Sequence, residues 1–425
     1  MRAVPKQKTT VAVRMRNLGF GDSHLVTVSQ GRAVWRMLVD CGVHSQGQAR
    51  PISESVDEII ADLSQAAPEG KPPHLDVLVA THHHADHISG FALDAWEAVD
   101  VGQVWVPFVE DASDPGANAL RTAHSAAANQ LLGLIQAAAG DTDRAGWSAS
   151  LAGANAFAVN CLGNADATDR LLGRNGRHFA NVPEVKFLPH RDSAQNVIDT
   201  GLPEVTVHVL GPPCDPAELR RMDPPPSLAW LQLDADQYQQ DDHAQPLFNS
   251  EFHLTTDQAR AQVPELFKAR NSLRLTQLSD SDEALLAAAA VLENAVNNTS
   301  VFFVLDVAGT RLLFPGDAQQ GAWDHVLDND GARGLITGLS FYKISHHGSH
   351  NGTPRRFVEQ VLGDGVYAML PWGLVKRWKD TIPSAALLKA LADRDTHVIR
   401  ADAPVAEPRV KVQGTSWSEV TFTVG

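Results

Sequence analysis

Cysteine is scarce in this chain, whose 425 residues contain only Cys41, Cys161 and Cys214. Three widely separated thiols are too few for a disulfide framework or for a metal site built from thiolates. Proteins with so little cysteine commonly keep it reduced. We therefore predict free thiols and a cytoplasmic location.

Long apolar runs are also missing. No segment approaches the roughly 18 to 20 apolar residues that a membrane-spanning helix needs. The most apolar stretch, ALLAAAAVLENAV at 284–296, contains a glutamate and an asparagine and predicts an ordinary buried helix. Residues 1–24 have basic side chains but no apolar segment or small-residue cleavage site of a secretory signal. The sequence thus predicts no membrane contact, and it leaves the oligomeric state open.

Basic residues are outnumbered: 35 lysines and arginines face 50 acidic residues, for a net charge of −15. An acidic surplus works against non-specific binding of polyanions, because binding to phosphates depends on positive charge. We see no basic, aromatic-rich stretch typical of nucleic-acid binding. Long nucleic acid would therefore need a local basic groove.

Strand patterns occupy both ends of the chain and resume between two longer stretches. The predicted strands are 9–16, 24–29, 33–40, 75–81, 204–211, 300–307, 310–317, 341–348, 366–373, 396–401 and 418–424. Helical patterns cover 56–65, 118–140 and 384–395. We predict one domain, 1–425, with insertions at about 91–200 and 212–297 that shape a substrate cleft or an oligomer contact.

Four histidines and an aspartate crowd the stretch THHHADHISG (81–90), directly after the apolar strand LDVLVA. Residues two apart at a strand end face the same side, so His82 and His84 can converge on one ion. Asp86 and His87 follow at the turn, where they could hold a second ion. His83 should point away, into packing or a hydrogen bond. Imidazole and carboxylate ligands suit divalent first-row metals.

Two later segments offer further ligands. In LLFPGDAQ (312–319), Asp317 follows a strand, and its carboxylate could bridge two cations about 3.5 to 4 Å apart. In YKISHHGSHNG (342–352), His346 and His347 again stand at a strand end. Neighbouring strand residues face opposite sides, so we expect one of the pair to be a ligand, and the sequence does not say which.

These motifs, in this order, resemble the metallo-β-lactamase superfamily. His82, His84, Asp86 and His87 match its metal signature, Asp317 its bridging aspartate, and His346 or His347 its last histidine. The finer resemblance is to the hydrolase domain of ComEC-type DNA-uptake competence proteins. It is carried by GFGDSHLVTV (19–28), LVDCG (38–42), NNTSVFFVL (297–305), LLFPGDA and HHGS.

The resemblance implies an α/β fold, an αββα sandwich of two facing mixed sheets with outer helices, and a metal site along one edge. It suggests that Asp22 and Asp40 support the metals, although aspartates at turns could equally cap strands. Ser349 and His350, beside HHGS, are further candidates for supporting or substrate-contacting residues. Two divalent metal ions are implied, Zn²⁺ in the first place and Mn²⁺ as the alternative.

One feature departs from the superfamily pattern. Many members supply a third histidine to the first metal from a strand midway along the chain, where this sequence reads VTVHVLGPP (205–213). His208 is the nearest candidate but lies inside the strand, and His243 and His253 are alternatives. The membrane segments of the competence proteins are also absent, so DNA transport is not implied.

The function implied is hydrolysis by a metal-bound water that loses a proton near neutral pH; Asp86 orients the resulting hydroxide and can accept the proton. The resemblance favours phosphodiester bonds, in nucleic acid or a small phosphate ester. An acyl-ester, thioester or lactone hydrolase of the same fold is the alternative. A catalytically weak binding module is a third reading, which the absent third histidine allows.

Overall fold

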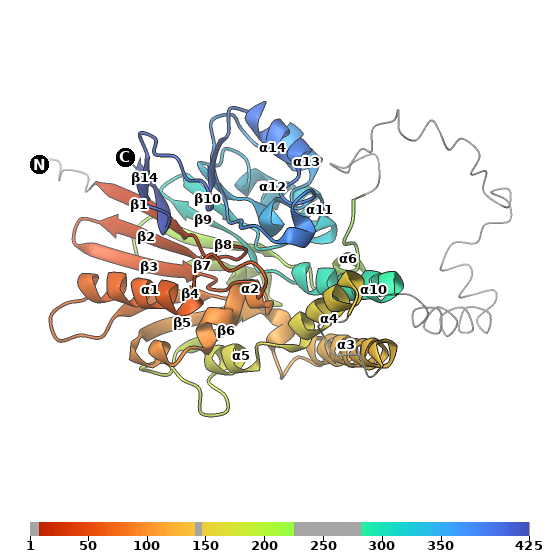
Figure 1. Ribbon diagram of the computed structural model, residues 1–425. Coiled ribbons are helices and arrows are strands. Elements are labelled where there is room, and N and C mark those ends of the chain that lie inside the picture. The colour runs from red at the N-terminus through yellow and green to blue at the C-terminus, as the bar shows by residue number, and fades with distance from the viewer. Residues whose placement is uncertain (1–7, 141–146, 225–281, 425) are drawn as a thin grey trace, which may run out of the picture. The chain divides into compact units, whose positions relative to one another are not determined.

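Two mixed β-sheets form the centre of the larger of two compact units (Figure 1). The computed structural model describes residues 8–140, 147–224 and 282–424. The larger unit comprises Met1–Ala123, Gly163–Trp230 and Asn294–Gly425, and the smaller unit comprises His124–Leu162 and Leu231–Glu293.

The first sheet has the strand order β14-β15-β1-β2-β3-β4-β5-β6. Its strands are β1 (Thr9–Arg16), β2 (His24–Gln30), β3 (Ala33–Val39), β4 (His74–Val79), β5 (Asp100–Pro107), β6 (Glu184–Leu188), β14 (Val410–Gln413) and β15 (Trp417–Val424). Strands β14 to β3 pair antiparallel, and β3 to β6 pair parallel. Strands β5 and β6 belong to the stretch 91–200 in which we predicted an insertion, so part of that stretch builds the sandwich.

The second sheet has the order β13-β12-β11-β10-β9-β8-β7. Its strands are β7 (Val197–Asp199), β8 (Val205–Gly211), β9 (Phe302–Val307), β10 (Thr310–Phe314), β11 (Phe341–Lys343), β12 (Tyr367–Leu370) and β13 (His397–Arg400). Strands β10 to β13 are parallel, whereas β7 to β10 are antiparallel.

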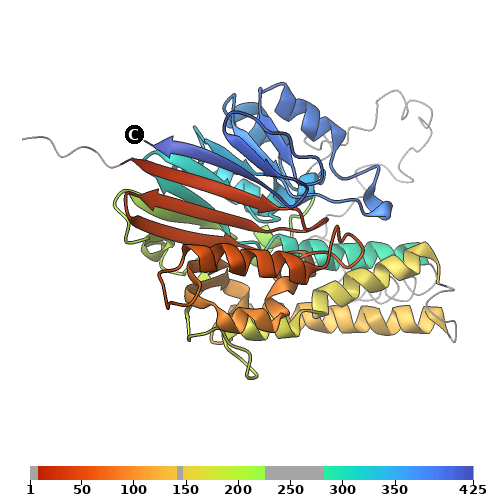
Figure 2. The ribbon, with the colours of Figure 1, turned by 60° about the vertical axis from the view of Figure 1, so that its left-hand side comes forward.

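Apolar side chains separate the layers of the larger unit. Residues of both sheets, among them Val26, Met37 and Phe303, share one core. Helix α1 (Ile52–Ala66) lies along the other face of the first sheet (Figure 2). It buries Ile59 and Leu63 in a core shared with that sheet. The other face of the second sheet packs against α11 (Gln320–Leu327), α13 (Arg355–Gln360) and α14 (Ala385–Ala392). Because successive side chains of a strand point to opposite faces of its sheet, each sheet contributes to two apolar cores, one between the sheets and one beneath its helices. The predicted αββα fold class is confirmed.

The smaller unit contains α4 (Ala149–Leu162), the later part of α3 (Pro115–Ala139) and most of α10 (Asp282–Asn297). Within it, His124 Nε2 lies 3.0 Å from the carbonyl oxygen of Leu292. Helices α3 and α10 confirm the helices predicted at 118–140 and 284–296. In the described ranges, no helix combines the length and apolarity required to cross a bilayer. The prediction of a single domain stays a prediction.

The parallel strands of the two sheets determine at which edge the loops with candidate site residues lie. Strands β3 and β4 end together in the first sheet, as do β10 and β11 in the second. Because parallel neighbours end at one edge, the loops that follow them converge there. These loops carry Asp40, the histidine-rich stretch, Asp317 and the paired histidines.

Candidate metal centre

The histidine-rich stretch lies directly beyond β4 and enters the short helix α2 (Ala85–Ile88). His82, His84, Asp86 and His87 are all buried. As predicted, the rings of His82 and His84 converge: Nε2 of His82 lies 3.0 Å from Nδ1 of His84. One Zn²⁺ ion with bonds of about 2.0 to 2.1 Å to each nitrogen would bring two rings this close.

The histidine between them points elsewhere, also as predicted. Nδ1 of His83 lies 3.1 Å from Oε1 of Glu110, which is itself buried. His83 therefore belongs to a neighbouring polar contact and not to the convergent pair.

A second group of donor atoms forms beside the first. Nε2 of His87 lies 3.1 Å from Oδ2 of Asp317, and Nε2 of His347 lies 3.1 Å from Oδ2 of Asp86. The same Asp317 oxygen is 3.5 Å from Nε2 of His347. Segments more than two hundred residues apart thus place four ligand-type atoms within one small volume.

The backbone around Asp317 leaves room for nothing larger than glycine before it. Gly316 has a φ of +56°, and a Cβ atom there would lie 2.7 Å from Cβ of Ser300. Ser300 Oγ accepts a hydrogen bond from the backbone N–H of Asp317 at 3.0 Å and lies 3.2 Å from Nδ1 of His82. Ser300 therefore connects the two donor groups. Sequence reasoning missed it as a site residue, although it stands in the NNTS motif.

His346 and His347 differ in direction because of an unusual turn. Both adopt the left-handed conformation, with φ of 49° and 50°, which side chains other than glycine enter at an energetic cost. The ring of His347 reaches Asp86, while that of His346 contacts Asn297 and Asn351. The backbone N–H of His346, however, donates to Oδ1 of Asp317 at 3.1 Å.

Two of the imidazoles, those of His87 and His347, are oriented by contacts of their Nδ1 atoms. Nδ1 of His87 lies 2.8 Å from Oδ2 of Asp40, and Nδ1 of His347 lies 2.7 Å from the carbonyl oxygen of Pro371. Asp40 also accepts two hydrogen bonds at 2.7 Å from Thr81. Such contacts fix the tautomer that leaves Nε2 facing the site, as is usual for metal-ligating histidines.

Asp22 and Lys343 are two further buried charged residues at the centre. Asp22 is fully buried, and its backbone N–H donates to the carbonyl oxygen of Asp86 at 2.9 Å. Lys343 Nζ lies 2.8 Å from Oδ2 of Asp22 and 2.9 Å from Oδ1 of Asp317. Nothing in the motifs pointed to this lysine, because a lone lysine within a strand pattern gives no signal.

The buried imidazoles fall into two classes according to the direction in which their pKa is shifted. Burial lowers the pKa of His84 to about 3 and that of His82 well below its usual range, so both rings are neutral, the form in which imidazole can bind a metal. Burial also opposes charge on His87, but Asp317 and Asp40 outweigh it and raise the pKa of His87 well above its usual range. The pKa of His347 is raised in the same way, against burial, by Asp317 and Asp86.

The donor set fits a divalent metal. Donor atoms of Asp22, His87, Asp317 and His347 all lie within 4.8 Å of one another. Oδ1 of Asp86 is buried and forms no hydrogen bond with any described residue. Buried polar atoms without partners are unfavourable unless an ion or water satisfies them. Mixed nitrogen and oxygen ligands suit Zn²⁺ or Mn²⁺.

An aromatic and basic rim adjoins His347. The ring of Phe20 packs 4.2 Å from that of His347 and 4.7 Å from that of Trp378, between centroids. Trp378 ends a short helical turn, Lys376–Trp378, and both Lys376 and Lys379 are exposed. The run 376–379, KRWK, combines three basic residues with one tryptophan.

The remaining predicted residues lie outside the cluster or at its margin. His208 sits within β8 opposite Val304, and its pKa, lowered by burial, is influenced by Asp306 and Arg311 and not by the site. Ser349 donates to Oδ1 of Asn351 at 3.0 Å and so supports the turn. Half-buried His350 lies 3.8 Å from Asp223. The candidates His243 and His253 lie outside the described residues.

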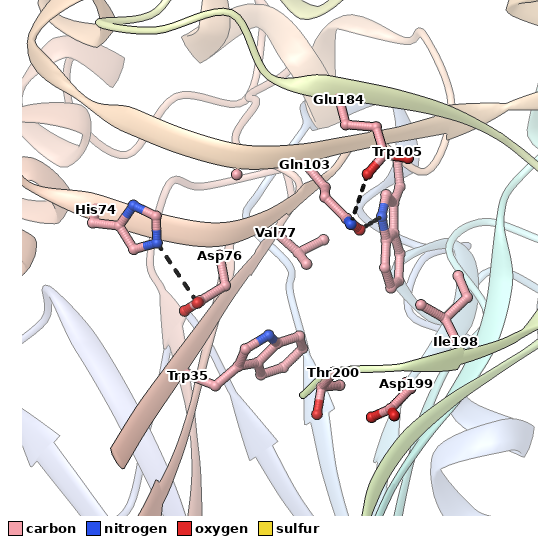
Figure 3. A pocket seen from close by; sticks show the side chains of 11 residues that line it. Trp35, His74, Asp76, Val77, Gln103, Trp105, Glu184, Ile198, Asp199 and Thr200 are labelled. Atoms are coloured by element: carbon pink, nitrogen blue, oxygen red, sulfur yellow. Dashed lines mark hydrogen bonds and ion pairs between the residues drawn. The ribbon is translucent and has the colours of Figure 1, made fainter. Parts of the chain in front are cut away.

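A surface pocket of about 270 Å³ lies near the opposite, amino ends of β4 and β6 (Figure 3). Its lining includes Trp35, His74, Trp105 and Glu184. The convergent histidines and carboxylates follow the carboxyl ends of the strands, so this pocket is not part of the candidate centre.

Comparison with known families agrees with the geometry. An αββα sandwich with histidines and aspartates at one sheet edge defines a class of metal-dependent hydrolases. Residues 16–107 match the family model of the Metallo-beta-lactamase superfamily. The matched segment runs from the end of β1 through β5 and includes the histidine-rich stretch. No curated protein matches the chain.

Proposed function

We propose that this protein is a metal-dependent hydrolase of phosphodiester bonds. The observation that carries the proposal is the convergence of Asp86, His87, Asp317 and His347 at the edge between the sheets. Buried carboxylates and imidazoles this close are costly unless they are paired or bind a metal ion. The superfamily match of residues 16–107 supports hydrolysis as the reaction class.

Two groups of residues would each bind one metal ion. His82 Nε2 and His84 Nδ1 would hold one ion, and Asp86, His87 and His347 the other. Oδ2 of Asp317 would face both. Bound divalent ions lower the pKa of water and stabilise charge that develops on the substrate.

Asp86 is the proposed proton acceptor. Its Oδ2 contacts His347, while Oδ1 is buried without a hydrogen bond to a described residue. Burial alone would raise the pKa of Asp86, but the hydrogen bond from His347 and the neighbouring imidazoles keep the pKa well below its usual range. The carboxylate is therefore ionised, so Oδ1 can accept a hydrogen bond from an attacking water and orient it; transfer of the proton would depend on bound metal lowering the pKa of that water.

The rim favours a phosphate-bearing substrate. Exposed Lys376 and Lys379 can contact phosphate oxygens, and they flank the partly buried Trp378. The net charge of −15 still disfavours a long duplex, so we propose single-stranded nucleic acid or a small phosphodiester. The finer resemblance to ComEC-type hydrolase domains is in line with this proposal.

The test compares substrates on the metal-loaded full chain. Bis-(p-nitrophenyl) phosphate, single-stranded DNA and RNA should be cleaved, and a thioester panel should not. Asp86→Asn and a chelator should each reduce turnover to background, while His208→Ala should retain it. Cleavage of thioesters alone would favour the acyl-ester alternative, and metal binding without any turnover would favour a binding module.

A further inference from the structure

Lys343 ends β11 with its ammonium group buried among the carboxylates of the centre; only 3% of the side chain is exposed. Nζ donates to Oδ1 of Asp317 at 2.9 Å and to the carbonyl oxygen of Gly316 at 3.0 Å, and it forms an ion pair with Asp22 at 2.8 Å. No motif assigns this lysine a role, and the superfamily match ends at residue 107.

Four buried carboxylates meet at this edge, and each needs compensation for the loss of water. Asp40 receives hydrogen bonds from Thr81 and contacts His87, and Asp86 contacts His347. Within the described part of the chain, Lys343 is the only lysine or arginine that pairs with Asp22 or Asp317.

The ammonium also joins the two sheets. Asp22 follows β1 in the first sheet, whereas Asp317 follows β10 and Lys343 ends β11 in the second. Because Oδ1 of Asp317 is engaged by Lys343 and by the backbone N–H of His346, Oδ2 is left directed at Nε2 of His87, 3.1 Å away.

We propose that Lys343 is a positioning residue: its ammonium is a resident cation that holds Asp22 and Asp317 together across the two sheets before metal binds. The metal-binding arrangement then exists in the metal-free protein, and folding does not depend on metal. This inference rests on the proposed metal centre.

The test measures thermal unfolding of the full chain in chelator and in saturating Mn²⁺. Without the ammonium, two buried carboxylates repel each other, and a divalent cation can replace the lost charge. In chelator, Lys343→Met should lower the unfolding midpoint by on the order of 5 °C or more. Mn²⁺ should restore at least half of that loss, so it should raise the midpoint more in the variant than in the wild type.

Arg170→Met is the matched control. Arg170 is fully buried in the same unit and donates to the Phe91 carbonyl oxygen and to Asp94, away from the centre. Its loss should lower the midpoint equally in chelator and in Mn²⁺. A merely structural role for Lys343 would give that same pattern.

The outcomes separate the two proposals. If neither Mn²⁺ nor Zn²⁺ raises the midpoint of the wild type, the metal centre itself is wrong. If the wild type responds and Lys343→Met responds by the same amount, the role of Lys343 is wrong. Should Lys343→Met fail to fold, the double variant Asp22→Asn/Lys343→Met, which removes one carboxylate, should fold in chelator. Its failure to fold would overturn the inference.

Discussion

His346 and His347 provide a sharp test of the centre, because they are adjacent, share one backbone conformation and point different ways. Only the ring of His347 reaches the cluster, at Asp86 and Asp317. Asparagine tolerates the left-handed conformation better than most residues. His347→Asn and His346→Asn are therefore matched substitutions that differ mainly in which contacts they remove.

The expected magnitudes follow from those contacts. A four-ligand structural zinc site binds with about 10–16 kcal/mol, so an equal share for one ligand is about 3 kcal/mol. That corresponds to roughly a hundredfold loss of metal affinity for His347→Asn. His346→Asn removes contacts to Asn297 and Asn351 but keeps the backbone N–H that Asp317 accepts. Its metal affinity should change by less than about tenfold.

The assay is competition with a chromophoric chelator, using Zn²⁺ and Mn²⁺ in turn, with turnover of bis-(p-nitrophenyl) phosphate as the second readout. Circular dichroism of both variants controls for folding. Equal losses in the two variants, or a larger loss in His346→Asn, would show that the orientation of this turn has been misassigned.

Three further predictions concern the surroundings of the centre. Asp40→Asn should weaken metal binding about 10- to 100-fold by chelator competition, because Asp40 orients His87. His208→Ala should leave kcat/KM within about twofold, since His208 lies within β8 away from the cluster. The hydrogen bond from Arg50 holds the pKa of Glu58 below its ordinary value of 4.5, although burial acts in the opposite direction. Ionised Glu58 therefore stabilises the folded protein above pH 4.5, and this contribution is lost as the pH falls through the lowered pKa. In urea unfolding, Glu58→Gln should therefore be less stable than the wild type at pH 7, and the difference should shrink below pH 4.5.

Sequence patterns predicted most strands of the two sheets, because alternation and short apolar runs report burial directly, but they did not predict β5, β6, β7 or β14. Every strand expected from 9–16 to 418–424 is present, and the convergence of His82 with His84 followed from their spacing. Spacing could not separate His346 from His347. Their directions depend on two consecutive left-handed residues, and the modest enrichment of histidine in that region does not predict two in a row.

Residues that act through long-range contacts were missed. Lys343 occupies a strand position whose neighbours are apolar, and only the ends of β1 and β10 turn that position into an ion-pair site. Ser300 looked like the start of a strand, yet its hydroxyl links Asp317 to His82. In both cases the partner lies in another sheet or loop, so the local sequence contains no information about it.

The two donor groups are unequal, and this inequality bears on how the centre would work. The pair His82 and His84 offers two nitrogens, with the ring of His87 4.1 Å from that of His82 between centroids, whereas the other group draws on His87 itself and two or three further side chains. The larger number of ligand-type side chains, carboxylates among them, favours the second group as the first to bind metal. Oδ2 of Asp317 would then be shared with a more weakly held ion at the histidine pair. Lys343 engages Oδ1 of Asp317. The proposed positioning role of this lysine would therefore also leave Oδ2 as the Asp317 oxygen available to the more weakly held ion.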